Sequence, residues 1–191
     1  MMLTSCTKAE DLLALPHDGV DRALIRGQLI EYPLVGYSPH YRDRFSAALL
    51  PRLCTELFNW LERQPEPRGD VFADRVGCVL ERDPDTVVGV DVAYFSAQQM
   101  HRQPANAPLL EGAPTLAIEI VSSLKTKANI LPKIDVLLRS GALLVWLVEP
   151  LTQTFSSFRA NEPTQQFMSS DIISADPFLP GFTLPVAQFF T

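Results

Sequence analysis

Residues 142–148 restrict the fold of this chain more than any other segment, because every residue in that run is apolar. A strand of this kind is typical of the middle of a sheet whose two faces are both covered. Residues 115–122 read as another strand, and residues 129–140 between the two carry helical spacing. This order predicts a parallel, right-handed strand–helix–strand unit over residues 115–149, and therefore an α/β protein.

The ends of the helix expected over 129–140 carry recognisable signals. Asn129 is a candidate N-cap, Pro132 is tolerable in a first turn, and Gly141 is a typical stop. On this helix Lys133 falls beside the apolar stripe that contains Ile130, whereas Asp135 points to solvent. The helix is therefore expected to bring one lysine towards the sheet.

Turn and helix signals divide the rest of the chain into short elements. An apolar stripe at four-residue steps predicts a helix over 38–63, and Pro51 within it predicts a kink or a break into two helices. The stripe consists of Phe45, Leu49, Leu53, Leu57 and Leu61. The other expected elements are a short helix ended by Pro16, a hairpin around Arg26-Gly27, strands over 70–96 with a turn at 83–85, an irregular segment over 97–114 and a strand-rich tail over 161–191. Together they predict a single domain over 1–191, with a core at about 20–160, in which helices flank a central mixed sheet and additional strands lie towards both termini.

The composition excludes several functional classes. No apolar run reaches the ~18 residues of a membrane span, and the N-terminus lacks the basic start of a signal peptide, so we expect a cytoplasmic protein with no membrane partner. The net charge of −6 argues against indiscriminate coating of nucleic acid, although a local basic groove remains open. The three cysteines and three histidines are scattered, and no glycine-rich phosphate loop occurs, so a thiol or imidazole nucleophile and a nucleotide site have no support. A homodimer is an open alternative to a monomer.

Two acids interrupt strands that are otherwise apolar. Strand alternation puts Glu119 on one face with Ala117, and Asp91 on one face with Ala93. If the two strands are neighbours, the carboxylates converge, and Lys133 approaches them from the helix. Two carboxylates and a lysine are the groups that metal-assisted phosphodiester hydrolysis uses. A structural ion-pair network is the other interpretation of the same residues.

The chain resembles the Uma-type restriction-endonuclease-like proteins of bacteria in four stretches. These are "VVGVDVAYFSAQQM", "PTLAIEIVSS", "PKIDVLLRSGALLVWLVEP" and "FLPGFTLPVAQFF". The resemblance implies the PD-(D/E)XK nuclease fold with a divalent-metal site. Asp91 and Glu119 match the acids of the family pattern, Ser122 its serine and Lys133 its helical lysine. The implied candidate catalytic residues are therefore Asp91, Glu119 and Lys133, with Mg²⁺ (or Mn²⁺) held by the two acids and the backbone carbonyl of Ile120.

The sequence departs from the family pattern at several positions. Val90 replaces the proline before the aspartate, and Val121 stands where PD-(D/E)XK nucleases often have their lysine. Ala23 replaces an acid of the first strand, and Arg42 replaces a histidine of the first helix. These changes concern activity and substrate contact more than fold.

The implied activity is that of a Mg²⁺-dependent endonuclease whose partner is DNA. The residues expected to contact the substrate are Arg42, Arg44, Ser122, Lys125 and Lys127. Two alternatives stay open, a non-catalytic interaction protein on a degenerate nuclease scaffold and a hydrolase of another phosphate ester.

Overall fold

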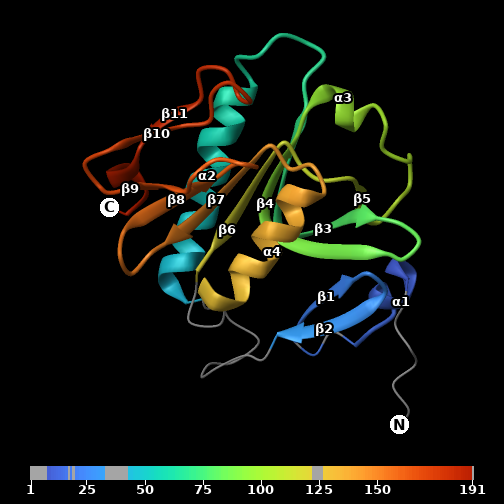
Figure 1. The fold of residues 1–191 in the computed structure, drawn as a ribbon. Helices are drawn as coiled ribbons and strands as arrows, with labels where there is room; N and C mark the ends of the chain where they lie inside the picture. The colour runs from blue at the N-terminus through green and yellow to red at the C-terminus, as the bar shows by residue number, and fades with distance from the viewer. Residues whose placement is uncertain (1–7, 17, 19, 33–42, 122–126, 191) are drawn as a thin grey trace.

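The structure is a computed structural model that describes residues 8–16, 18, 20–32, 43–121 and 127–190. Its centre is a large mixed sheet (Figure 1). The strands along the main path of the sheet are, in order, β2 (Gln28–Tyr32), β1 (Asp21–Ile25), β4 (Thr86–Phe95), β6 (Leu116–Ile120), β7 (Leu144–Glu149), β8 (Thr154–Phe158) and β9 (Gln165–Phe167). The strands off this path are β3 (Asp70–Glu81) and β5 (Leu110–Glu111). The β6–β7 and β3–β5 pairs are parallel and the other pairs are antiparallel, so the predicted mixed sheet is confirmed.

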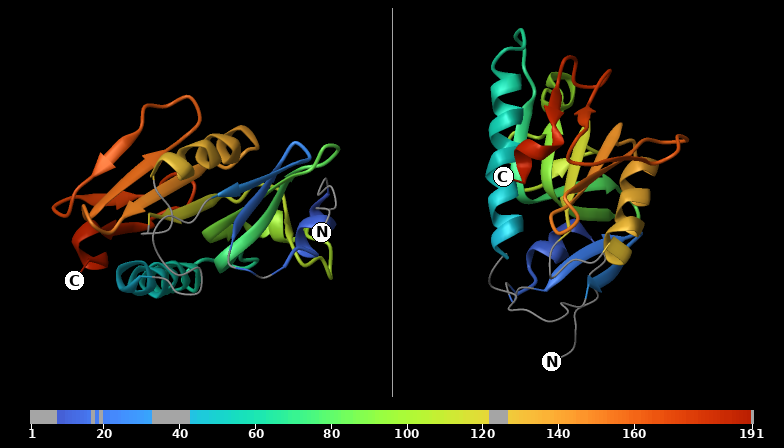
Figure 2. Two further views of the ribbon diagram at one scale, coloured as in Figure 1. Left: turned by 90° about the horizontal axis from the view of Figure 1, so that it is seen from below. Right: turned by 90° about the vertical axis from the view of Figure 1, so that its left-hand side faces the viewer.

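Two long helices cover opposite faces of this sheet, as Figure 2 shows from below. They are α2 (Arg44–Leu61) and α4 (Lys127–Arg139). The shorter elements are α1 (Ala9–Leu13), α3 (Ala97–Met100), the small hairpin of β10 (Ile172–Ser174) and β11 (Thr183–Pro185), and a 3₁₀ turn, η1 (Val186–Phe189). No helix among the described residues is long and apolar enough to cross a lipid bilayer.

The core on the α2 side unites the middle of the chain with its C-terminal part. Leu53 of α2, Trp146 of β7 and Phe182 belong to one buried cluster, and the Trp146 and Phe182 rings stack at 5.9 Å. Trp146 is fully buried and β7 lies between β6 and β8, which confirms the predicted central strand. Because Phe182 and Val186 are buried in this same cluster, the tail after residue 160 contributes to the main core.

The core on the α4 side holds the residues of the predicted helical stripe. Ile130, Ile134 and Leu137 pack against the α4-facing side of the sheet. The helix ends at Arg139, and Gly141 follows with a φ of 102°, a conformation that glycine adopts without steric cost. The predicted stop is thus confirmed.

The structure corrects the predicted helix over 38–63. Residues 38–42 lie outside the described part of the chain, and the described helix begins after Asp43, whose side chain accepts hydrogen bonds from the first turn. The helix passes through Pro51 as one element, so of the two predicted alternatives, a kink or a break, the break does not occur. Burial of Leu49 and Leu53 on either side compensates for a proline that costs roughly 3 kcal/mol in a helix interior. Phe45, predicted to be in the buried stripe, is 45% exposed because it lies in the first turn of the helix.

The second helix and the segment before β6 also differ from the prediction. α4 begins at Lys127, so Asn129 is not its N-cap and Pro132 lies inside the helix. In the first described turn of α4, Lys127 Nζ forms a 2.7 Å ion pair with Glu149 at the end of β7. Within the segment predicted to be irregular, β5 pairs with β3 over two residues.

Strand alternation in β4 is broken near its middle. Val88 and Val90, predicted on the face opposite Ala93, belong to the same buried cluster as Ala93. The partner strand β3 shifts register at this level, between its residues 73 and 76. An extra residue in one strand is a β-bulge, which increases the local twist and changes which face the side chains occupy. The predicted alternation therefore holds over residues 92–95, where Val92 and Tyr94 lie in the α2-side cluster and Ala93 and Phe95 in the α4-side cluster, and is wrong for Val88 and Val90.

Candidate active site

The two candidate acids lie on adjacent strands of the sheet. β4 and β6 pair antiparallel, with Val92 opposite Ile118 as the last pair of this ladder, and Asp91 and Glu119 are the next residues of the two strands. Asp91 Oδ2 accepts a 2.9 Å hydrogen bond from the backbone N–H of Ile120. Asp91 is 1% exposed and Glu119 is fully buried. Two carboxylates thus share one buried position in the sheet.

Lys133 reaches these carboxylates from α4. Its Nζ lies 2.8 Å from Glu119 Oε1 and donates a second contact, also 2.8 Å, to the backbone carbonyl of Gly89 on β4. The lysine is 6% exposed, because it follows Ile130 and precedes Leu137 along the buried side of the helix. Helical spacing therefore places a cation beside Glu119, whose strand also receives the Asp91 carboxylate.

A buried thiol lies near the charges of the site. Burial raises the pKa of Cys78 to about 12, and the negative charge of Glu119 adds to this effect while Lys133 opposes it. The thiol consequently stays protonated at neutral pH and is a poor nucleophile. If Asp91, Glu119 and Lys133 are all ionised, the group carries one net negative charge, which favours a bound cation.

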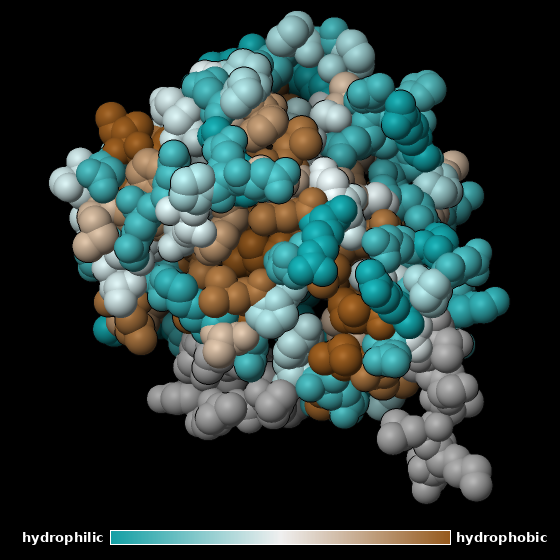
Figure 3. Space-filling model, viewed as in Figure 1, coloured by the Kyte–Doolittle hydropathy of each residue, from teal (hydrophilic) through white to brown (hydrophobic). Residues whose placement is uncertain are grey.

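Apolar side chains enclose this charged group. Ala93, Ala117 and Leu147 lie in the same buried cluster as the helical residues above them. Figure 3, seen from the side of Figure 1, shows apolar residues gathered near the middle of the face where α4 meets the sheet, with polar residues around them. A low-dielectric surrounding strengthens any electrostatic interaction at the site.

The Uma2 family, described as "Putative restriction endonuclease", matches residues 9–187. The chain belongs to this family. Among solved structures it is similar to a "putative nuclease belonging to DUF820" from Anabaena variabilis ATCC 29413, with a TM-score of 0.74 and 19% sequence identity. That match covers 95% of this chain and 96% of the other, and at this identity it shows the fold alone, in agreement with the predicted fold class. No curated protein matches the chain.

The substrate contacts expected for a Uma2-family chain are only partly described. Arg42, Ser122 and Lys125 lie outside the described residues. Arg44 is exposed at the start of α2, with its guanidinium carbon 4.6 Å from the centroid of the Phe45 ring. Lys127 is exposed but pairs with Glu149, as described above. The starts of α2 and α4 and the end of β6 lie at one end of the molecule in Figure 1 and in the right-hand view of Figure 2.

Two polar groups that contact lysines of α4 were not identified from the sequence. The Gly89 carbonyl, a partner of Lys133, leaves no side-chain signal that a pattern could reveal. Glu149 did leave a signal. It is the last residue of β7 and lies two positions after Leu147, which pairs with Glu119. An acid at the end of a buried strand could have been noted as a helix contact.

The metal-ligand chemistry of the described residues is limited to a small set. No cluster of three or more His, Cys, Asp or Glu side chains able to hold a metal ion occurs within the described ranges. Asp91 and Glu119 supply two carboxylates, and Ile120 supplies backbone beside Asp91. Two hard oxygen ligands fit Mg²⁺, because this ion is commonly bound through one or two carboxylates plus water and substrate phosphate.

Proposed function

We propose that this chain is a divalent-metal-dependent endonuclease that hydrolyses DNA phosphodiester bonds, with Asp91, Glu119 and Lys133 as its catalytic residues. The observation that carries the proposal is that the buried Asp91 carboxylate on β4 bonds to the backbone of Ile120, the neighbour of the buried Glu119 on β6, while a lysine from α4 lies 2.8 Å from Glu119. Folding alone gives no reason to place two like charges side by side in an apolar cluster. Membership of the Uma2 family supports the same reaction class.

Asp91 and Glu119, together with the carbonyl of Ile120, would hold Mg²⁺ or Mn²⁺. The bound ion would supply Lewis acidity towards a phosphate oxygen and would lower the pKa of a coordinated water. The Ile120 N–H orients Asp91 for this role, because it holds Oδ2 of this carboxylate beside Glu119 on β6. Position and charge are therefore set by the chain itself.

Lys133 would donate hydrogen bonds to the attacking water or to the phosphate oxygen that gains charge. Its present partners, Glu119 and the Gly89 carbonyl, keep its ammonium between β6 and the strand that carries Asp91. At the same end of the molecule, Arg44 and Lys127 would neutralise substrate phosphates, and we assign the same role to Arg42, Ser122 and Lys125. With a net charge of −6, such binding depends on these local contacts.

A non-catalytic role on the same scaffold is the second candidate. The observation that favours it is that Lys133 already contacts one carboxylate and one carbonyl, as a structural ion pair would. In that case the lysine compensates for the burial of Glu119, and a metal ion has no effect on the protein.

The test is cleavage of supercoiled, linear and single-stranded DNA with Mg²⁺ or Mn²⁺, comparing the wild type with Glu119→Gln. Gln keeps the size of the side chain but removes its charge. We expect metal-dependent cleavage by the wild type and none by the variant. Wild-type protein that cleaves none of these substrates with either metal, or a variant that is equally active, would contradict the proposal.

A further inference from the structure

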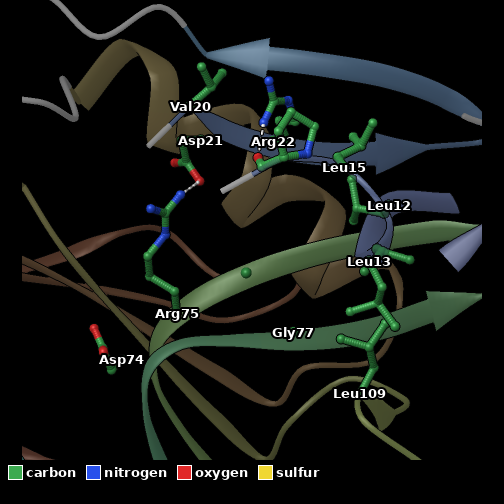
Figure 4. Close-up of a pocket in the computed structure, with 13 residues that line it drawn as sticks. Leu12, Leu13, Leu15, Val20, Asp21, Arg22, Asp74, Arg75, Gly77 and Leu109 are labelled. Carbon is green, nitrogen blue, oxygen red and sulfur yellow. Dashed lines mark hydrogen bonds and ion pairs between the residues drawn. The ribbon is translucent and has the colours of Figure 1, made fainter. Parts of the chain in front are cut away.

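A cavity that neither Asp91 nor Glu119 lines lies between α1, β1 and the β3–β4 pair (Figure 4). Its volume is about 610 Å³, within the range of roughly 300–1,000 Å³ that is common for small-molecule sites. β1 pairs with β4 at Leu24 opposite Val87, and the cavity lies where the β1–β2 hairpin diverges from β4 beyond this contact. Nothing in the proposed nuclease reaction uses this space.

The lining of the cavity is divided into an apolar half and a polar half. Figure 4 shows Leu12, Leu13, Leu15 and Leu109 gathered on one side, at α1 and the segment before β5. Arg75 stands on the other side, with its guanidinium directed at Asp21. A ligand that fits both halves must itself have an apolar body and a polar end.

The polar half of the cavity can donate hydrogen bonds to a ligand, mainly from Arg75. Arg75 Nη2 lies 2.7 Å from Asp21 Oδ1, and this single bond leaves further N–H groups on a side chain that is 43% exposed. Arg22 has less to offer, because its nitrogens are bonded to Asp18 and Glu31 as well as to a backbone carbonyl. A carboxylate or phosphate oxygen is the group that the fork of an arginine binds best.

The backbone that holds Arg75 is unusual. Asp74 and Arg75 have φ values of 72° and 64°, in the left-handed region that non-glycine residues seldom adopt. Such conformations cost of order 1 kcal/mol or more each and are concentrated at functional sites. Here the two residues form the β3 bulge and turn Arg75 to the mouth of the cavity.

Glycine forms part of the cavity wall at the level of this bulge. Gly77 and Gly89 face each other across β3 and β4, and both line the cavity. A Cβ at Gly89 would meet nothing closer than the Arg75 carbonyl oxygen at 3.8 Å, so the space beside it is open. A side chain at this position would occupy room that a ligand could use.

We propose that this cavity binds a small amphipathic anion, with its apolar chain against the α1 leucines and its carboxylate or phosphate on Arg75. The lining charges, Arg22 and Arg75 against Asp21 and Asp74, balance one another, so the anion is held by the arginine fork and by apolar burial. Affinity should therefore depend only weakly on ionic strength. The proposal is independent of catalysis at Asp91 and Glu119.

The test is calorimetric titration of the full chain with decanoate, and with decanol and decylammonium as neutral and cationic probes of equal chain length. We expect one site of micromolar affinity for decanoate, with decanol bound about tenfold more weakly and decylammonium more weakly still. Arg75→Gln should weaken decanoate binding about tenfold and leave decanol unchanged. Gly89→Val, which fills the cavity beside the bulge, should weaken both.

Two control variants separate this site from other effects. Arg139→Gln removes another arginine that pairs with one carboxylate, on the outer side of α4, and should leave decanoate binding unchanged. Asp135→Asn, which removes the partner of Arg139 on the same exposed side of α4, should also leave it unchanged. Equal binding of the three probes, equal binding by wild type and Arg75→Gln, or no binding of decanoate would each overturn the proposal. None of these outcomes bears on DNA cleavage, which is measured separately.

Discussion

Two buried aspartates belong to the same stretch of chain and have opposite surroundings. Asp85 directly precedes β4 and is 5% exposed, and Asp91, in the middle of β4, is 1% exposed. Asp85 accepts hydrogen bonds from the backbone N–H of Ala9 at 2.8 Å and from Arg82 at 2.9 Å. Its partners come from its own turn and from the helix that the turn anchors. Asp85 is therefore a structural joint between α1 and the β3–β4 turn.

Asp91 has a neighbour that a structural joint does not need. Asp91 bonds to the backbone of Ile120 on β6, next to a second buried acid, Glu119, and the charge that pairs with Glu119 comes from Lys133 on a separate helix. Bringing two carboxylates together raises the free energy of the folded state unless a cation is bound between them. The difference between the two aspartates suggests that the acid at 85 serves stability and the acid at 91 serves binding.

The largest expected effect concerns cleavage. If this comparison holds, Asp91→Asn should reduce metal-dependent DNA cleavage about 10³-fold or more, since it removes a ligand charge from the site. Asp85→Asn should leave the rate within about threefold, because its contacts lie in the turn before β4. The measurement is initial cleavage rate on supercoiled DNA at fixed Mn²⁺. Equal losses in both variants would erase the distinction.

The second expectation concerns Lys133 and Arg82, the cations that pair with Glu119 and Asp85. Lys133→Met removes the charge that faces Glu119 inside the core and should cost about 3–5 kcal/mol of unfolding free energy. Arg82→Met acts on a side chain that is 42% exposed and should cost about 1 kcal/mol. Urea denaturation of both variants measures the difference. The double variant Lys133→Met with Glu119→Gln should recover most of the loss, and failure to recover it would show that packing, and not charge, was lost.

The third expectation is stabilisation by metal. Mn²⁺ at a hundredfold excess over its Kd should stabilise the wild type by about 2.7 kcal/mol, because the ion binds the folded state alone. Glu119→Gln should stay folded, since Asp91 and Lys133 still balance each other, and should show a much smaller shift. Calorimetric melts with and without metal test both statements. An unshifted wild type together with a variant destabilised by about 3–5 kcal/mol would support the structural ion pair instead.

Much of this arrangement follows from local sequence patterns. The central strand β7 was predictable from its uniform apolar composition, and the approach of Lys133 to the sheet from its place on the α4 stripe. The position of Glu119 on the α4 side follows from strand alternation, because β6 is regular over its whole length. Periodicity of 2 and 3.6 residues is a property of neighbouring residues, so it can be recognised without tertiary information.

The features that escaped prediction depend on contacts between distant segments. Asp74 and Arg75 adopt left-handed backbone conformations, but neither is a glycine, so the sequence carries no signal for the bulge. The bulge shifts the register with β4, the strand in which alternation is lost. α4 already includes Lys127, which pairs with Glu149 of β7, whereas the local signal favoured Asn129 as a cap. The catalytic roles of the three site residues remain predictions, whereas their positions are now described.

The smallest expected effect has a distinctive pH dependence. Burial alone would raise the pKa of Asp85, but the N–H groups of Ala9 and Asp83 and the Arg82 guanidinium outweigh it and hold the pKa below its usual 3.8. A carboxyl with a lowered pKa in the folded state stabilises the protein above its unfolded pKa, and the contribution disappears as the pH falls through the folded value. Asp85→Asn should therefore cost about 1–2 kcal/mol at pH 7, and the difference from the wild type should shrink as the pH falls below 3.8. Urea denaturation of both proteins between neutral and acid pH measures this, with Asp135→Asn on the exposed side of α4 as a control that should change little. A loss that does not diminish in acid would mean that the Asp85 side chain acts through its shape, and the joint would then owe its stability to packing and not to the buried charge.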